Sequence, residues 1–213
     1  MIIRVIRAMP IVVLTDENLK EELTGDVKVL EEVTYIKDIG EFHEHKADAF
    51  IDLLFQESHM DTLKQLLPGL VIINSVDRTL AETNTSFVRI NAWPTLLKSP
   101  VIEASTLEKR NIEKAESVFS LFNKKVEWLS DEIGFITPRV ISMIINEAFM
   151  ALEENISTKE EINTAMKLGT NYPYGPFEWA EKIGLDKISS LLLRLSKEQT
   201  RYQPSSSLLQ ASV

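Results

Sequence analysis

Residues 49–55 read Ala-Phe-Ile-Asp-Leu-Leu-Phe, and residues 70–73 read Leu-Val-Ile-Ile. Both segments are too short for typical helices and are apolar almost throughout, which is typical of strands buried on both faces of a parallel sheet. Residues 58–67, between them, have the charged, helix-like pattern of a connecting helix. A strand, a helix and a second strand in this order predict a right-handed βαβ unit.

The same alternation extends over the first 130 residues. Further strands are expected at residues 1–6, 10–14, 27–33 and 101–104, and further helices at residues 16–23 and 107–124. Alternating strands and helices predict an α/β domain with a parallel sheet. We expect this domain to cover residues 1–130.

After Ser130 the sequence pattern becomes wholly helical. Ile141, Ile145 and Phe149 recur at helical spacing. A capping box at residues 157–160 opens a second helix that is expected to end at Gly169. A third helix is expected between Gly175 and Gly184, a fourth from Asp186 to about Glu198, and a frayed tail from Thr200. The fold class is therefore α/β plus all-α, with a helical domain over residues 131–213.

The composition excludes several classes of function. The 213 residues carry a net charge of -9 and include no cysteine. An acidic chain is unsuited to nucleic acid, and without cysteine there are no disulfides, iron–sulfur clusters or thiolate zinc sites. The longest apolar run is shorter than the ~18 residues of a membrane helix. Arg4, Arg7 and Pro10 interrupt the apolar start, so a signal peptide is not expected and a cytoplasmic protein is.

Glycine is scarce where a nucleotide loop would need it. The chain has seven glycines, whereas average usage would give about fifteen. The first 130 residues contain only Gly25, Gly40 and Gly69, none of them two or three residues apart. Dinucleotide folds use closely spaced glycines to bring the backbone against the pyrophosphate. The sequence therefore predicts an α/β domain that lacks the glycine loop.

Six segments of the helical half form a recognisable series. They occur in this order: Gly134-Phe-Ile-Thr-Pro-Arg139, Asn146-Glu-Ala148, Met166-Lys-Leu-Gly169, Tyr174-Gly-Pro-Phe-Glu178, Gly184-Leu-Asp186 and Arg201-Tyr-Gln-Pro-Ser205. Together they resemble the C-terminal domain of the 3-hydroxyacyl-CoA dehydrogenases. A weaker similarity extends back through residues 100–103, 89–94 and 71–75, and it fades upstream of about residue 65.

The resemblance implies a specific catalytic pair. Enzymes of this family pass a hydride between NAD and the C3 carbon of an acyl-CoA, while a histidine takes the hydroxyl proton and a glutamate twelve residues later orients it. Glu103 matches the glutamate, but Asn91 stands where the histidine would be. An amide cannot act as a general base near neutral pH. Glu103 is interpreted equally as a relic, as a poised carboxylate or as a residue bonded to backbone amides.

Three further positions follow from the resemblance. Pro138 replaces an asparagine that contacts substrate, and Ser75, or Val76 without a one-residue shift, matches a substrate-binding serine. Asp16 stands where an acid would bind the ribose of NAD, although capping of the next helix is the favoured interpretation. NAD is thus implied by the family alone.

The histidines do not predict a metal site. His43 and His45 are two residues apart, so they share neither a strand face nor a helix face. A solvated charged turn is the favoured interpretation of this segment. His59 precedes a predicted helix and is expected to cap it or to face water.

Three functions remain open at this level. The leading hypothesis is a degenerate homologue with a shortened Rossmann-like domain over residues 1–130. It forms a homodimer through residues 131–213 and binds or scaffolds, with an acyl-CoA-like ligand as one candidate, without efficient NAD-dependent catalysis. The first alternative is an active NAD-dependent oxidoreductase of fatty-acid metabolism, acting on 3-hydroxyacyl-CoA or 3-hydroxybutyryl-CoA with Glu103 as the base. The second is a ligand-sensing protein that uses the cleft between the domains. Nucleic acid and membranes are not expected as partners.

Overall fold

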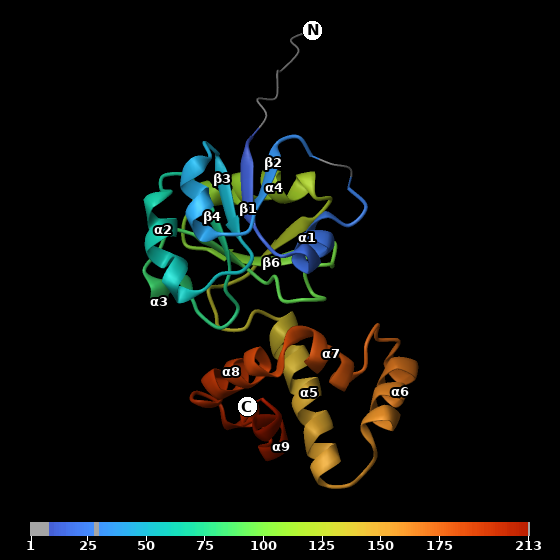
Figure 1. The fold of residues 1–213 in the computed structure, drawn as a ribbon. Coiled ribbons are helices and arrows are strands. Elements are labelled where there is room, and N and C mark those ends of the chain that lie inside the picture. The colour runs from blue at the N-terminus through green and yellow to red at the C-terminus, as the bar shows by residue number, and fades with distance from the viewer. Residues whose placement is uncertain (1–8, 28–29, 213) are drawn as a thin grey trace. The chain divides into compact units, whose positions relative to one another are not determined.

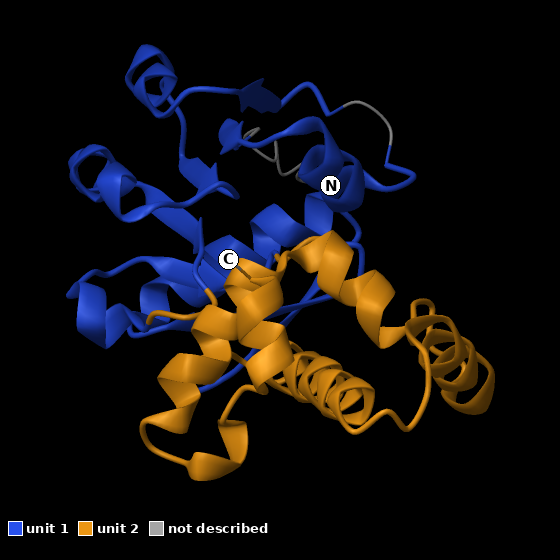
Figure 2. Ribbon diagram, turned by 60° about the horizontal axis from the view of Figure 1, so that its bottom comes forward, with its two compact units in different colours: residues 1–75, 79–92, 97–131 blue, residues 76–78, 93–96, 132–213 orange. Residues whose placement is uncertain are grey.

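The computed structural model describes residues 9–27 and 30–212, so the strand predicted at residues 1–6 lies outside the described part. The chain forms two compact units (Figure 2). The α/β unit comprises residues 1–75, 79–92 and 97–131, and the helical unit comprises residues 76–78, 93–96 and 132–213. Each unit has its own architecture and is described separately.

The α/β unit is built on a sheet whose described strands follow the order β2-β1-β3-β4-β5-β6-β7. Neighbouring strands are parallel except for β5 and β6, which are antiparallel. The strands are β1 (Ile11–Leu14), β2 (Val33–Ile36), β3 (Ala49–Asp52), β4 (Leu70–Asn74), β5 (Val88–Ile90), β6 (Val101–Thr106) and β7 (Lys125–Trp128).

Two strands were not predicted and one is displaced. β5 is short and has Arg89 at its centre, and β7 alternates charged and apolar residues, so neither has the apolar run that marked the other strands. The strand predicted at residues 27–33 begins only at Val33. The helix predicted at residues 107–124 is shorter, because β7 starts at Lys125.

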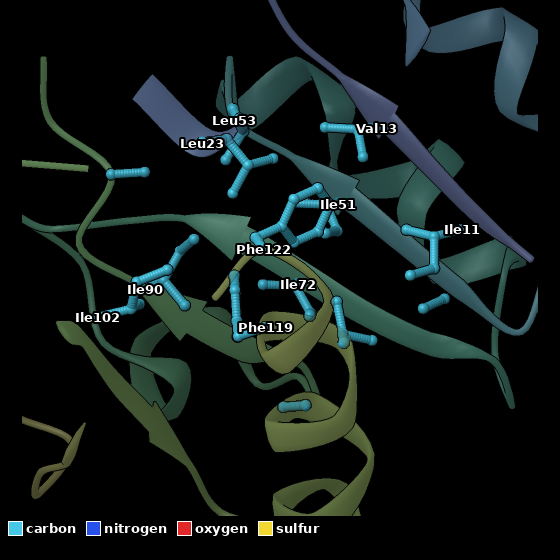
Figure 3. Close-up of a cluster of buried hydrophobic side chains, with 14 of the residues drawn as sticks. Ile11, Val13, Leu23, Ile51, Leu53, Ile72, Ile90, Ile102, Phe119 and Phe122 are labelled. Atoms are coloured by element: carbon cyan, nitrogen blue, oxygen red, sulfur yellow. The ribbon is translucent and has the colours of Figure 1, made fainter. Parts of the chain in front are cut away.

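Helices cover both faces of this sheet (Figure 1). On the first face, α1 (Glu17–Thr24) and α4 (Ile112–Leu121) pack against a core that includes Ile51 and Ile72 (Figure 3). On the second face, the short helices η1 (Ile39–Glu44), α2 (Met60–Gln65) and α3 (Leu80–Thr83) contribute Phe42, Leu63 and Leu80 to a separate core. The sheet is therefore doubly wound, as the alternation of strands and helices predicted.

The helical unit contains α5 (Thr137–Glu153), α6 (Lys159–Thr170), α7 (Pro176–Ile183), α8 (Leu185–Ser196) and α9 (Ser206–Ala211). Several boundaries differ from the prediction by a few residues. Thr158 and Glu161 form the capping box of α6, and that helix ends at Asn171, whose left-handed backbone replaces the expected stop at Gly169. Gly184, rather than Asp186, caps α8.

The tail after Thr200 is folded, so the prediction of a frayed end was wrong. Its backbone is held by the buried side chain of Asn146 on α5. The Asn146 amide nitrogen donates to the carbonyl oxygen of Gln203 at 3.0 Å, and its Oδ1 accepts from the backbone N–H of Ser205 at 2.8 Å. These bonds satisfy backbone groups that a polar sequence pattern does not reveal.

Candidate functional site

A row of polar residues crosses three adjacent strands of the α/β unit. Asn74 is in register with Ile90, and Ile90 is in register with Ala104, so the next positions place Ser75, Asn91 and Glu103 side by side. The Asn91 backbone N–H donates to the Glu103 carbonyl oxygen at 3.0 Å. We call Ser75, Asn91 and Glu103 the polar row.

Within the polar row, the side chains of Asn91 and Glu103 are bonded to each other. Nδ2 of Asn91 donates to Oε2 of Glu103 at 3.0 Å. Asn91 is buried and Glu103 is half-buried. The arrangement positions an amide against a carboxylate, and it can bind a polar group, but the amide cannot accept a proton from an alcohol.

A buried arginine fixes the backbone beside the polar row. Arg89 is 0% exposed. Its Nη1 donates to the carbonyl oxygen of Ser75 at 3.0 Å, and its Nε donates to Oδ1 of Asp131 at 2.6 Å. The Asp131 carboxylate also accepts the backbone N–H groups of Leu80 and Ala81 at the start of α3. The visible sequence signal was an arginine between apolar residues, but its partner is 42 positions away.

Asp16 lies elsewhere in the unit, at the end of β1. Its Oδ1 accepts from the backbone N–H of Leu19 at 2.8 Å, so the expected capping role is confirmed. The turn after β1, Thr15-Asp16-Glu17, contains no glycine. A carboxylate already accepts an N–H at this helix start and repels phosphate. The residues of this turn do not fit the pyrophosphate of NAD.

Pro138 belongs to the helical unit. It is buried in the first turn of α5, where a missing N–H costs no helical hydrogen bond. Of the predicted site residues, the structure thus brings together Ser75, Asn91 and Glu103, whereas Asp16 caps α1 and Pro138 opens α5.

The α/β unit contains a second polar pair, Asp52 and His59, that the sequence did not predict. Asp52, the last residue of β3, is 0% exposed. Its Oδ2 lies 2.7 Å from Nδ1 of His59, and its Oδ1 accepts from the backbone N–H of Leu54 at 3.0 Å. Burial raises the pKa of Asp52, and the hydrogen bond from His59 acts in the opposite direction. His59 does stand at the N-cap position of α2, as expected, but its side chain makes no capping bond and is bonded to Asp52 instead.

The described residues 9–27 and 30–212 contain no group of three or more potential metal-ligating side chains. Within the same part of the chain, no helix is long and apolar enough to span a bilayer. His43 lies in η1, and His45 is the residue that follows the end of η1. Asp38 and Glu41 form the capping box at the start of η1.

Comparisons with known proteins agree with the motifs of the helical half. Residues 134–212 match the family model of the 3-hydroxyacyl-CoA dehydrogenase C-terminal domain. The chain is 40% identical over 92 residues to 3-hydroxyadipyl-CoA dehydrogenase of Escherichia coli, covering 42% of this chain and 19% of that protein. It is 32% identical over 114 residues to 3-hydroxybutyryl-CoA dehydrogenase of Clostridioides difficile, covering 53% of this chain and 41% of that one.

The fold of the whole chain also has solved counterparts. The crystal structure of FadB2 from M. tuberculosis superposes with a TM-score of 0.74 at 14% identity, over 95% of this chain and 92% of that chain. At this identity the match concerns the fold alone. The chain spans less than half the length of the two curated relatives. The resemblance seen in the sequence and the α/β plus all-α fold class are confirmed.

Proposed function

We propose that this protein, whose residues 134–212 match the C-terminal domain of the 3-hydroxyacyl-CoA dehydrogenases, binds an acyl-CoA-like ligand as a homodimer without efficient NAD-dependent hydride transfer. The observation that carries the proposal is the bond between Asn91 and Glu103, 3.0 Å long, at the positions of the family's catalytic pair.

The proton-transfer step supports this assignment. Oxidation of a hydroxyl group requires a base that removes its proton. Asn91 has no basic nitrogen, because its amide nitrogen is a donor and already donates to Glu103. The amide and the carboxylate together can still donate to and accept from a bound polar group. The polar row is therefore suited to binding a ligand rather than to taking a proton through Asn91.

The turn after β1 supports the second half of the proposal. Asp16 already accepts the Leu19 N–H at the start of α1, so this helix start does not offer that N–H to the pyrophosphate of NAD. Glu17 adds a second acidic side chain to the same first turn. An anionic cofactor is disfavoured at this position, so we expect weak NADH binding.

The homodimer rests on the surface of the helical unit. Ile136 is 57% exposed and Val140 is 51% exposed, and they are one helical turn apart at the start of α5. A two-fold contact between copies would bury this apolar surface. Light scattering at micromolar concentration should give a dimer, and Ile136→Asp should shift it to a monomer. A monomeric wild-type protein would contradict this part of the proposal.

The catalytic claim is tested by titrating NADH and following its fluorescence, and then by measuring NADH consumption with acetoacetyl-CoA. Calorimetry with acetoacetyl-CoA alone measures ligand binding independently. We expect acetoacetyl-CoA to bind, NADH to bind weakly and turnover to be absent. Tight NADH binding with turnover would instead establish an active oxidoreductase, and failure of acetoacetyl-CoA to bind would remove the proposed ligand.

Two variants separate the parts of the argument. Glu103→Ala should weaken acetoacetyl-CoA binding because it removes the acceptor of the Asn91 amide, whereas the control Glu113→Ala, on the exposed side of α4, should not. Asn91→His restores a base beside Glu103, yet we expect no turnover because the turn at Asp16 is unchanged. If Asn91→His does gain turnover with NADH, the inference that NADH binds weakly is wrong. The inference that Asn91 lacks the basicity for proton transfer would then be supported.

A further inference from the structure

Asp52 and His59 lie where the strand order of the sheet reverses. The chain leaves β1 for β2 on one side and then returns to β3 on the other side of β1. Leu14, the last residue of β1, is in register with Asp52, so these two strands end together. Asp16 then opens α1 on the first face, and His59 directly precedes α2 on the second face (Figure 1). Doubly wound sheets bind ligands outside the strand ends at such a reversal.

The hydrogen bond between Asp52 and His59 determines the tautomer of the His59 ring. A carboxylate only accepts hydrogen bonds, so the nitrogen 2.7 Å from Oδ2, Nδ1, carries the proton. In the neutral ring Nε2 is then an acceptor. Oδ1 of the same carboxylate is bonded to the Leu54 backbone at 3.0 Å, which holds Asp52 in place. The His59 side chain is 13% exposed, so part of the ring reaches the surface.

The charges around His59 restrict the ligand class. Glu57 opens the short helix η2 (Glu57–His59), and Asp61 lies in the first turn of α2, so acidic residues flank His59 on both sides in the chain. Asp16 adds a carboxylate at the neighbouring strand end. These groups repel phosphates and carboxylates. An uncharged molecule that donates hydrogen bonds suits both the acidic surroundings and the acceptor nitrogen.

We propose that His59, oriented by Asp52, is the hydrogen-bond acceptor of a second binding site, which takes an uncharged polyhydroxyl compound. This site differs from the Asn91–Glu103 pair of the polar row, because β3 and β5 are separated by β4 and hence by about 10 Å at the usual strand spacing. It also does not depend on the proposed acyl-CoA binding. Asp52 is a positioning residue, and His59 is the residue that contacts the ligand.

The site is tested by nitrogen NMR of the imidazole rings, with glycerol as the neutral probe and glycerol 3-phosphate as its anionic counterpart. In the wild-type protein the ring of His59 should be protonated on Nδ1. Glycerol should shift the His59 resonances in a saturable manner, and glycerol 3-phosphate should shift them less. A proton on Nε2, unmoved His59 resonances, or equal shifts at His43 would overturn the proposal.

Two variants distinguish orientation from mere folding. Asp52→Asn can donate to Nδ1 and so favours the Nε2-protonated ring, which is a donor rather than an acceptor. We expect this variant to bind glycerol about tenfold more weakly. His59→Gln should also lose the binding, whereas His43→Gln should retain it. Unchanged glycerol affinity in a folded Asp52→Asn variant would contradict the positioning role, and the ring tautomer of the wild type tests the proposal if that variant does not fold.

Discussion

The two units bury different kinds of polar group. Among the described residues, the charged side chains that are buried, Asp52, Arg89 and Lys124, all belong to the α/β unit. The buried polar residues of the helical unit are uncharged: Ser142, Asn146, Ser189 and Ser205. A buried charge is costly unless it is paired or hydrogen-bonded. The α/β unit therefore needs specific polar partners for its buried charges, whereas the described part of the helical unit buries only uncharged polar side chains.

Lys124 and Asn163 illustrate the contrast. Nζ of Lys124 donates to the carbonyl oxygens of Leu97 at 2.6 Å and of Ser99 at 3.0 Å, so a buried charge is met by backbone dipoles. In the helical unit, Asn163 lies directly against Gly175, leaving no space for a side chain there.

The largest expected effect is the loss of the buried ion pair of the α/β unit. Arg89→Met leaves Asp131 and the carbonyl oxygen of Ser75 without their guanidinium partner. Breaking such a pair costs about 3–5 kcal/mol of folding free energy. Hydrogen exchange, resolved by peptide, should show faster exchange throughout the α/β unit.

The exposed pair of Lys37 and Glu17, 3.1 Å apart, is the matched control. Lys37→Met should leave exchange unchanged, because exposed ion pairs contribute little. If Arg89→Met accelerated hydrogen exchange in the helical unit as much as in the α/β unit, the distinction between the two units would be wrong.

A smaller effect is expected from backbone shape in the helical unit. Gly134 has φ +87°, and a Cβ there would lie 2.9 Å from Cγ of Arg139 and 3.0 Å from Cδ1 of Leu191. Gly134→Ala should lower the free energy of unfolding by about 1–3 kcal/mol, measured by urea titration.

Replacing Gly169 with alanine should have the opposite effect on the free energy of unfolding. It lies inside α6, and nothing lies within 4 Å of a Cβ built there. Gly169→Ala should stabilise the helical unit by up to about 1 kcal/mol, because alanine is the better helix former. Destabilisation by both substitutions would show that the shape argument is incorrect.

The smallest effect concerns the pH dependence of the α/β unit. Burial lowers the pKa of Lys124 below 10.5, against the opposing effect of Glu22. Between the lowered value and 10.5 the unfolded chain binds more protons, so this residue's contribution to stability rises as pH rises through that window. As pH rises through this window, the free energy of unfolding of the wild type should therefore increase relative to that of Lys124→Met. A pH-independent difference, from urea titrations across the window, would contradict this.

Local sequence patterns were sufficient where an element is made by its own residues. The apolar runs at residues 49–55 and 70–73 predicted β3 and β4, because strands buried on both faces need apolar side chains on both. The short β5 and the edge strand β7 were not predicted, because neither contains an apolar run. They form strands because they pair with β4 and β6 in the sheet. The order of motifs also identified the family of the helical half.

The features of the candidate site also divide into those determined by the sequence and those decided by the tertiary structure. The sequence by itself determined that Asn91 stands twelve residues before Glu103 and that closely spaced glycines are missing from the first 130 residues. Only the tertiary structure decided that Ser75 joins this pair, that Arg89 meets Asp131, and that Asp52 orients His59. These contacts depend on strand register and on loops that return to a strand end, because burial of a charge is decided by what the whole fold places beside it.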